Sequence, residues 1–570
     1  MKKGNKIIIT LLFATSIISC KNNDNLQTIC NPLNIGYQFE NNEVIHRDIC
    51  APCVVYYKNT YYLFASYIQG GYFSSEDLIH WKFISSNLPK DVTDPTVVEI
   101  NDRLYLTCSF RTSTIFTTNA PESGIWEIAT ENFPYNVSQP MLFYDEERLF
   151  MYSGMGSLGT LSGIEIDPHT WCPIDSFIPL ITTHKENGWE IPGDNNEWTL
   201  NPTWIEGAWM TKHSDTYYLL YATPSGYLKS LNDGVYVSNT PMGPFKQARH
   251  NPFSYKPEGF ITGAGNGCIF QDQYGNYWHL GASPISTKHI FERRLALHPV
   301  FFDNDGISYT YTGWGDYPMI IPKKKINSPQ ELQPEWMLLS YLKRTEASSE
   351  VRHYPACCAV DENIRSWWSA QTGNKGEYLT VDLGESCKVN AIQINFADHD
   401  FTLSECRDSL LYYQYQIEAS DDNKHWSVIA DRSHNQQNAP HDYIQLEKTV
   451  RKRYIKITNL YCPAGKFSLS GFRIFGKAEK TLPLKADFYM TVRDSTDRRK
   501  VILKWNPINN ATGYAIRYGI APDKLYHQYL VYDDTEITIR SLQASQSYYF
   551  TIDSFNEGGI THNEKTLLLK

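Results

Sequence analysis

The sequence lacks the features that would direct its interpretation toward nucleic acid, a membrane span or a cysteine metal site. Its 570 residues carry a formal net charge of −10, with no stripe of Lys and Arg, which argues against a nucleic-acid partner. Cys50 with Cys53, or Cys357 with Cys358, can be read as a metal or redox pair, but no second pair has ligand spacing. Scattered buried thiols are the better interpretation.

Long apolar runs are also scarce, and the one at the start is short. Ile7 to Ser19 follows Met1-Lys2-Lys3 and is too short to span a bilayer comfortably, which is typical of an export signal. Ile17-Ile18-Ser19-Cys20 resembles the bacterial lipobox, which implies lipidation of Cys20 and a signal peptide over residues 1–20. We therefore expect a lipid-anchored cell-envelope protein, on the outer membrane, periplasmic or surface face. The alternative is an ordinary secretory signal with a chance cysteine.

What the sequence does contain is aromatic residues and turn formers. The aromatic content is 14% and rich in tyrosine, alongside many Gly, Asn and Asp, which fits an all-β protein that presents flat rings to a ligand such as a sugar. A chain of this length predicts about three domains.

A hairpin pattern recurs five times in the first half of the chain. In each copy an apolar pair follows a key position, a polar turn comes next, and an aromatic residue stands eleven residues after the key position. The copies pair Ala51 with Tyr62, Asp94 with Tyr105, Gln139 with Phe150, Glu206 with Tyr217, and Asn266 with Tyr277. Repeated small antiparallel sheets predict a five-bladed β-propeller whose key positions ring one mouth of the channel. The alternative is five unrelated hairpins in a sandwich.

Glu206 is the anomaly of its hairpin and the first catalytic candidate. It is a carboxylate flanked by Trp204, Ile205 and, further along, Trp209, where the pattern predicts burial or a pocket wall. Apolar walls raise a carboxyl pKa toward the general-acid range.

From residue 30 to 325 the chain resembles glycoside hydrolase family 43, the five-bladed propellers that cleave arabinofuranosyl, xylosyl and related glycosides. The motifs that carry the resemblance, in order, are His46-Arg47-Asp48, Gly188-Trp189-Glu190, Trp204-Ile205-Glu206-Gly207, Asp233-Gly234-Val235-Tyr236, Gly243-Pro244-Phe245, Phe291-Glu292-Arg293-Arg294 and Gly315-Asp316-Tyr317.

The resemblance implies three carboxylates: a base aspartate in the first blade, a tuning aspartate in the third and an acid glutamate in the fourth. Glu206 matches the acid, but Ala51 and Gln139 stand in the other two registers. Asp94, in the equivalent register one blade on, is the expected base, with Asp48 as the alternative. An inverting reaction needs one protonated and one ionised carboxyl with room for water between them.

Further substrate-binding candidates follow from the same motifs. They are Asp48, Gln139, Trp189, Glu190, Trp204, Asn266 and Arg293, with Glu190 also a second acid candidate. Asn266 stands where relatives often carry a histidine associated with an axial metal. No cofactor is expected to be required; calcium is possible in the propeller channel or the following domain, and metal ligands remain unassigned.

Two further domains are expected. Residues 340–478 resemble a discoidin-like (factor V/VIII type C) jelly roll of the carbohydrate-binding type, through Ser366-Trp367-Trp368-Ser369 and Gly471-Phe472-Arg473-Ile474. Trp367 and Trp368 are interpreted either as a flat surface that binds a sugar or as part of the hydrophobic core of this domain. Residues 484–570 resemble a fibronectin type III sandwich with Trp505 in its core.

The predicted function is an inverting, exo-acting glycoside hydrolase of family 43 type with altered catalytic carboxylates. Its expected partners are a polysaccharide or oligosaccharide and, through the lipid, a membrane; we expect a monomer. The alternative is a glycan-binding lipoprotein whose propeller has lost hydrolysis.

Overall fold

A computed structural model describes residues 26–42, 44–402 and 411–570. Within these ranges every regular element is a β-strand or a short 3-10 helix, so the prediction of an all-β protein is confirmed. The predicted signal peptide and Cys20 lie outside the described residues. Among the described residues there is no helix of the length and hydropathy needed to cross a membrane.

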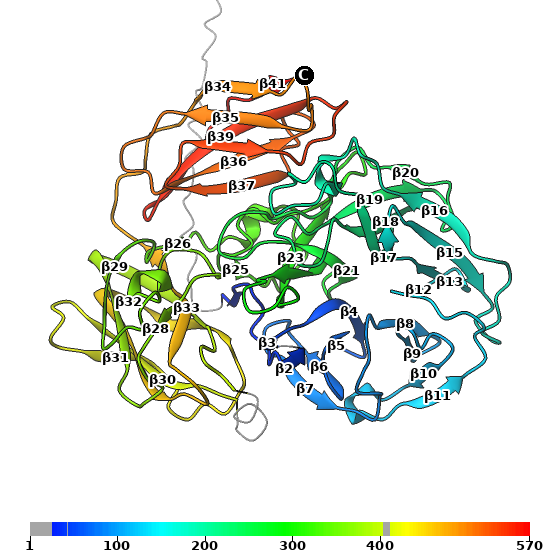
Figure 1. The fold of residues 1–570 in the computed structure, drawn as a ribbon, viewed down its shortest axis with the longest axis horizontal. Coiled ribbons are helices and arrows are strands. Elements are labelled where there is room, and N and C mark those ends of the chain that lie inside the picture. Colours follow the sequence, from blue (N-terminus) through cyan, green and yellow to red (C-terminus); the bar gives the residue numbers. More distant parts are fainter. Residues whose placement is uncertain (1–25, 43, 403–410) are drawn as a thin grey trace, which may run out of the picture.

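Five antiparallel sheets surround a common centre in the first half of the chain (Figure 1). The first sheet has β4 (Cys50–Tyr57), β5 (Thr60–Ser66), β6 (Gly71–Ser75) and β7 (Lys82–Ser85), and the second has β8 (Thr96–Ile100), β9 (Arg103–Thr107), β10 (Ile115–Thr118) and β11 (Glu127–Thr130). The third has β12 (Met141–Asp145), β13 (Arg148–Ser153), β15 (Thr160–Ile166) and β16 (Ile178–Thr182), and the fourth has β14 (Gly156–Ser157), β17 (Trp204–His213), β18 (Thr216–Thr223), β19 (Asn232–Ser238) and β20 (Lys246–Gln247). The fifth has β21 (Gly265–Gln271), β22 (Tyr277–Pro284), β23 (Arg293–Phe302) and β24 (Ser308–Thr310).

The sheets close into a ring, which makes them the blades of a propeller. The innermost strands β4, β8, β12, β17 and β21 pack on one another in that order, and β21 packs back on β4. All five aromatic residues of the repeat lie in the second strand of their blade. The five-bladed propeller is therefore confirmed, and the alternative of unrelated hairpins in a sandwich is wrong.

The register of the fourth copy differs from the expected one by a single residue. Ala51, Asp94, Gln139 and Asn266 all have left-handed backbones, with φ between 45° and 50°, but in the fourth blade the left-handed residue is Gly207, at φ 62°. The pair Glu206 with Ala222 precedes a β-bulge as the pair Cys50 with Ser66 does. Glu206 is thus the structural equivalent of Cys50, one residue before Ala51.

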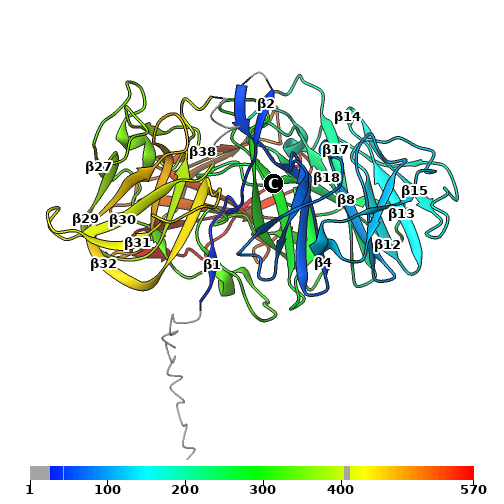
Figure 2. The same ribbon diagram turned by 90° about the horizontal axis from the view of Figure 1, so that it is seen from below.

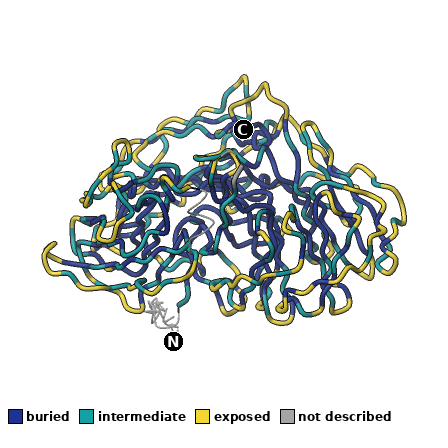
Figure 3. The backbone as a smooth tube through the Cα atoms, turned by 60° about the horizontal axis from the view of Figure 1, so that its bottom comes forward, coloured by how far each residue is buried: buried dark blue, intermediate teal, exposed yellow. Residues whose placement is uncertain are grey.

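Apolar side chains fill the spaces within and between the blades. Figure 3 shows the buried parts of the trace inside the molecule and the exposed parts at its edges. Trp209 belongs to this packing, because its indole Nε1 donates to the carbonyl of Ile269 in the next blade at 3.0 Å. The propeller also holds the short 3-10 helices η2 (Pro121–Ser123) and η3 (Gly188–Glu190) and the hairpin of β2 (Phe39–Asn42) with β3 (Val44–Arg47).

The second unit is a jelly roll centred on three long strands. Its main sheet has the order β26-β33-β29-β32-β30-β31, with β27 and β28 paired at its sides. The elements are η4 (Pro329–Leu332), which leads into it, β26 (Met337–Leu338), β27 (Arg344–Ala347), η5 (Ala356–Ala359), β28 (Trp368–Ser369), β29 (Tyr378–Phe396), β30 (Gln414–Ser420), β31 (Ser427–Asp431), β32 (His441–Tyr461) and β33 (Ser468–Lys477). Trp368 is buried in its core, whereas Trp367 is half-buried and stacks on Tyr354.

The last unit is a two-sheet sandwich. One sheet has β34 (Phe488–Arg493), β35 (Val501–Trp505) and β38 (Glu536–Ile539), and the other has β37 (His527–Tyr532), β36 (Gly513–Gly519), β39 (Tyr548–Asn556), β40 (Gly559–Thr561) and β41 (Leu567–Leu569). Trp505 is fully buried in its core, as predicted; the fibronectin type III assignment itself stays a prediction. The segment β1 (Thr28–Ile29), paired with β25 (Met319–Ile320), runs between the propeller and the jelly roll (Figure 2).

Candidate active site

A cavity of about 610 Å³ is open at one mouth of the propeller and draws its walls from all five blades. It brings together six of the sequence-predicted residues, namely Asp94, Gln139, Trp204, Glu206, Asn266 and Arg293. The repeat explains this convergence, because equivalent strand ends in different blades meet at the same mouth of the channel.

Asp94 is held by serines from two blades. Ser109 Oγ donates to Asp94 Oδ2 at 2.7 Å, and Ser66 Oγ donates to Oδ1 at 3.3 Å while accepting from the Asp94 backbone N–H at 2.7 Å. Burial raises the pKa of Asp94, and the two serines and the charge of Arg293 oppose that rise. The carboxylate is therefore fixed in position and stabilised in its ionised form by groups of the cavity wall.

Glu206 lies on β17 with its carboxyl buried at the floor of the cavity. Trp204 Nε1 donates to Glu206 Oε2 at 2.9 Å, and Gln139 Nε2 donates to the same oxygen at 3.4 Å. Burial raises the pKa of Glu206, and the negative charge of Asp94 raises it further; the bonds from Trp204 and Gln139 and the charge of Arg293 act in the opposite direction.

The two carboxyl groups influence each other through their charges. The negative charge of Asp94 raises the pKa of Glu206, and a charge on either group opposes ionisation of the other. The cavity therefore favours one protonated and one ionised carboxyl group, as an acid and a base acting together need.

Gln139 occupies the position where a tuning carboxylate was expected. Its amide nitrogen donates to Glu206, but its Oε1 is buried without a hydrogen-bond partner among the described residues. An amide can present either edge to a carboxyl group: the NH₂ stabilises the ionised carboxylate, and the carbonyl accepts from the protonated acid. Gln139 can therefore partner Glu206 in both protonation states.

Asp48 does not line the cavity, and its roles as a substrate-binding residue or as the alternative base stay predictions. It is buried and forms a two-pronged ion pair with Arg293, with Nη2 to Oδ2 at 2.6 Å and Nε to Oδ1 at 2.9 Å. The Arg293 backbone N–H also donates to Oδ1 at 3.0 Å. Both carboxylate oxygens of Asp48 therefore bond to Arg293, and Arg293 itself lines the cavity.

Trp189 and Glu190 also lie outside the cavity lining, and their assignment as substrate-binding residues stays a prediction. Both are fully buried in and around η3, where Trp189 Nε1 and Glu190 Oε1 bond to the hydroxyl of Tyr221. Burial raises the pKa of Glu190 to about 7. Glu190 does not line the cavity, and the shift follows from its buried position in η3.

Asn266 lines the cavity, and its backbone N–H donates to Asp233 Oδ1 at 2.7 Å. Asp233 in turn accepts from His279 Nε2 at 2.7 Å. Within the described part of the chain no group of three or more His, Cys, Asp or Glu residues has the arrangement of a metal site. Calcium binding therefore stays a prediction. Cys50 and Cys53 are buried free thiols, in accordance with the sequence interpretation.

Several residues of the site were missed. Ser66 and Ser109 each lie four residues after the aromatic residue of their copy, Tyr62 and Tyr105, so the repeat itself carried the signal. Ser109 Oγ also accepts from the Gln139 backbone N–H at 2.6 Å, as Ser66 does from Asp94. The aromatic and apolar side chains of the cavity mouth come from loops outside the repeat, so the repeat could not identify them; they are Tyr67, Phe110, Met155, Trp198, Tyr227 and Phe291.

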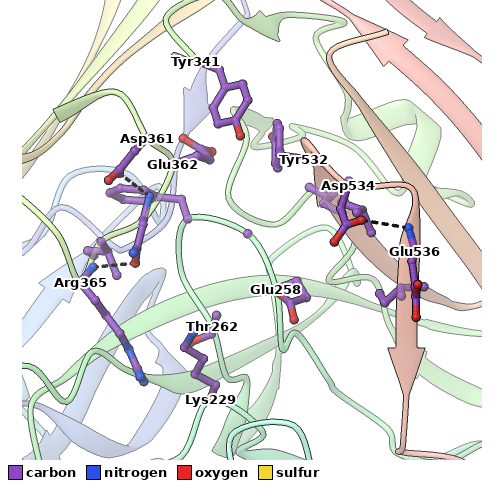
Figure 4. Close-up of a pocket in the computed structure, with 17 residues that line it drawn as sticks. Lys229, Glu258, Thr262, Tyr341, Asp361, Glu362, Arg365, Tyr532, Asp534 and Glu536 are labelled. Atoms are coloured by element: carbon purple, nitrogen blue, oxygen red, sulfur yellow. Dashed lines mark hydrogen bonds between the residues drawn. The ribbon is translucent and has the colours of Figure 1, made fainter. Parts of the chain in front are cut away.

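A second cavity, of about 340 Å³, lies where the propeller, the jelly roll and the sandwich meet. Figure 4 shows Glu258 and Lys229 of the propeller across from Asp534 and Glu536 of the sandwich, with Tyr341 and Tyr532 at one end. None of the predicted site residues lines it.

The fold and this cavity define a five-bladed propeller with two buried carboxyl groups at one mouth of its channel. Residues 40–308 match the model of the family described as glycosyl hydrolases family 43, and residues 358–457 match a NedA-like, galactose-binding domain. The propeller is therefore similar to family 43 glycoside hydrolases, and the jelly roll that follows is similar to galactose-binding domains. No curated protein matches the chain.

Solved structures similar to the chain include a thermostable family-43 glycoside hydrolase (18% identity, 52% of this chain and 100% of that one, TM-score 0.43). Another is an endo-1,4-beta-xylanase from Bacteroides thetaiotaomicron (21% identity, 46% and 94%, TM-score 0.40). A third is an alpha-L-arabinanase from Cellvibrio cellulosa in complex with arabinohexaose (14% identity, 46% and 96%, TM-score 0.35).

Proposed function

We propose that the propeller hydrolyses a glycosidic bond with inversion, with Glu206 as general acid and Asp94 as general base. The observation that carries this proposal is that both carboxyl groups line one cavity and that the charge of Asp94 raises the pKa of Glu206. The base thus comes from the second blade, because the first blade offers Cys50 and Ala51 in its place.

In this mechanism the sugar ring lies between the two carboxyl groups. Asp94 accepts a proton from a water molecule as the water oxygen forms a bond to the anomeric carbon. The bond from that carbon to the leaving oxygen breaks, and Glu206 gives its proton to the leaving oxygen. The separation typical of inverting pairs is roughly 6.5–9.5 Å, which leaves room for that water. The positive charge of Arg293 stabilises the ionised form of Asp94.

The substrate class follows from the cavity and its mouth. The floor offers carboxyl, amide and guanidinium groups that bond hydroxyls, and the mouth offers the exposed faces of Phe110, which is 64% exposed, and Trp198, which is 41% exposed. Flat apolar faces at the mouth suit the rings of a glycan chain beyond the cleaved unit. The proposed substrates are terminal arabinofuranosyl, xylosyl or galactofuranosyl units of a polysaccharide, removed by exo-action.

A panel of nitrophenyl glycosides and arabinoxylan oligomers tests the proposal. Release of a single sugar, with proton NMR showing the inverted anomer as the first product, supports it. The retained anomer as first product would rule out the assignment of Asp94 as base. Binding without any product supports the second candidate below.

The second candidate is a glycan-binding protein that no longer hydrolyses. The specific observation in its favour is that Gln139 and Ala51 stand at two of the three positions where the family resemblance places carboxylates. It differs from the first candidate in one measurable respect, since the wild-type protein would bind the glycan without releasing any product.

We also propose that the protein is a monomer held in the cell envelope by a lipid on Cys20. The support is the lipobox-like sequence Ile17-Ile18-Ser19-Cys20. Metabolic labelling with palmitate in the native host, with Cys20→Ser as the control, tests this. A labelled Cys20→Ser protein, or an unlabelled wild type, would contradict it.

A further inference from the structure

We propose that the discoidin-like jelly roll is a structural part of the active site, with Asp398 and His441 acting as positioning residues for Arg293. This inference rests on the proposed function where it concerns catalysis, and on geometry alone where it concerns the position of Arg293. The contacts that support it join two pairs of adjacent residues in the propeller to one end of the jelly roll.

The two pairs of adjacent propeller residues are joined to each other by two contacts. Arg47 and Asp48 follow one another at the end of β3, and Arg293 and Arg294 follow one another at the start of β23. Asp48 bonds to Arg293 on the cavity side, whereas Arg294 Nη1 donates to the Arg47 carbonyl at 2.7 Å. One member of each pair therefore serves the cavity, and the other faces the jelly roll.

The positive charge of Arg47 is neutralised by Asp398 of the jelly roll. Its Nε lies 2.6 Å from Asp398 Oδ2, and its Nη2 donates to Asp398 Oδ1 at 3.2 Å. Both side chains are almost completely buried, at 1% and 4% exposure. Tyr413 donates its hydroxyl to Asp398 at 2.8 Å, and Lys288 Nζ donates to the Asp398 carbonyl at 2.7 Å. A buried charge pair of this kind leaves one charge unpaired when either partner is removed.

Arg294 has a partner in the jelly roll as well. Its Nε donates to His441 Nε2 at 2.8 Å, so that nitrogen is an acceptor and the ring proton is on Nδ1. His441 Nδ1 lies 2.7 Å from Asn395 Oδ1 and donates to it. Burial, together with the positive charges of Arg294 and Arg47, lowers the pKa of His441, so the ring stays neutral and keeps this orientation.

The position of Arg293 matters because several ionisable groups face it. These are Asp48, Cys50, Tyr67, Asp94 and Glu206. Its charge lowers the pKa of both Asp94 and Glu206. If Asp398 no longer neutralises Arg47, the end of β3 loses its ion pair with the jelly roll, and Asp48 in the next position of the chain can move with it. Arg293 would then lose part of its ion pair and its fixed place beside the two carboxyl groups.

The test is Asp398→Asn, which preserves side-chain shape and the acceptor for Tyr413 but removes the charge. Hydrogen exchange with mass spectrometry follows the Arg293 amide, whose bond to Asp48 is independent of any activity. We expect exchange of the peptide around Arg293 to rise about tenfold, with peptides of the third blade unchanged. For hydrolysis we expect a fall in kcat/KM of about tenfold and a shift of both limbs of the pH profile to higher pH.

The double variant Asp398→Asn with Arg47→Gln removes both charges and should restore the exchange rate and the pH profile, because no charge is left unpaired. Asp382→Asn is the matched control, since Asp382 pairs with Arg453 entirely within the jelly roll. If Asp398→Asn does not fold, the milder Arg47→Lys, which keeps the charge but loses the two-pronged geometry, takes its place.

The outcomes separate this inference from the proposed function. Unchanged exchange at Arg293 and an unchanged pH profile, even with a lower Tm, would overturn the inference, because the jelly roll would then only stabilise the fold. A wild type that shows no hydrolysis would overturn the proposed function, while raised exchange at Arg293 in Asp398→Asn would still support the positioning role.

Discussion

Trp204 donates its indole N–H to the carboxylate of Glu206 at 2.9 Å, from two residues earlier on the same strand. Side chains at this spacing share one face of a strand, so both point into the cavity. The sequence suggested that tryptophans raise the pKa of Glu206 as apolar walls. The structure shows that Trp204 opposes the rise as a hydrogen-bond donor, and that burial and the charge of Asp94 cause it.

Glu206→Gln should abolish most hydrolysis while preserving binding. Glutamine fills the same space and can still bond to Trp204, but it has no proton to give to the leaving oxygen. We expect kcat to fall by about 10²–10⁴-fold on substrates with poor leaving groups, and less on nitrophenyl glycosides, whose leaving groups need little protonation. Steady-state kinetics on both substrate types measures this. Glu258→Gln, in the cavity at the domain junction, is the control and should keep full activity.

Asp94→Asn should lower kcat to a similar extent on both substrate types. The base activates water whatever the leaving group is, so the loss of about 10²–10⁴-fold should not depend on leaving-group quality. Asp91→Asn is the matched control, because Asp91 is an exposed partner of Arg111 near the same strand. Full activity in Asp94→Asn would eliminate the second-blade base and show that another group activates the water.

The fold could be predicted further than the site, and the reason is the repeat. Five copies of one pattern fixed the number of blades and the strands that carry the aromatic residues. The register of Glu206 was wrong by one residue because a β-bulge shifts the pairing after Glu206, and a bulge leaves no mark in an apolar-polar pattern. Asp48 shows a second limit, since its partner Arg293 is far away in sequence and only the closed ring brings the two together.

The activity should have a bell-shaped pH dependence. It should rise with pH as Asp94 ionises, at a pH above the ordinary aspartate value because burial raises its pKa, and fall as Glu206 loses its proton, again above the ordinary glutamate value. Gln139→Asp should move the falling limb up by about one pH unit, because a second negative charge beside Glu206 disfavours its ionisation. Gln139→Asn, which adds no charge, is the control. Profiles of kcat/KM against pH measure both, and identical falling limbs in the two variants would contradict the expectation.

Glu557 should make the attachment of the sandwich sensitive to acid. Lys343 Nζ lies 2.7 Å from one of its oxygens and Lys480 Nζ 3.0 Å from the other, and Glu557 is 5% exposed. Burial opposes ionisation, but the bond and charge of Lys343 and the bond from Lys480 lower the pKa of Glu557 to about 2. Since the folded pKa lies below the unfolded value, the stability it adds is fully present above about pH 4.3 and is lost as the pH falls toward 2.

The variant Glu557→Gln isolates this contribution. At pH 7 it should reduce the free energy of unfolding of the sandwich by about 2 kcal/mol, and the difference from wild type should shrink steadily between about pH 4.3 and pH 2. Urea unfolding followed by hydrogen exchange of the peptides of the sandwich, at a series of pH values, provides the measurement. Glu479→Gln is the control, because that carboxylate is 63% exposed in its pair with Arg451 and should change the midpoint little. A difference that stays constant down to pH 2 would show that the amide disturbs packing and that ionisation of Glu557 contributes nothing.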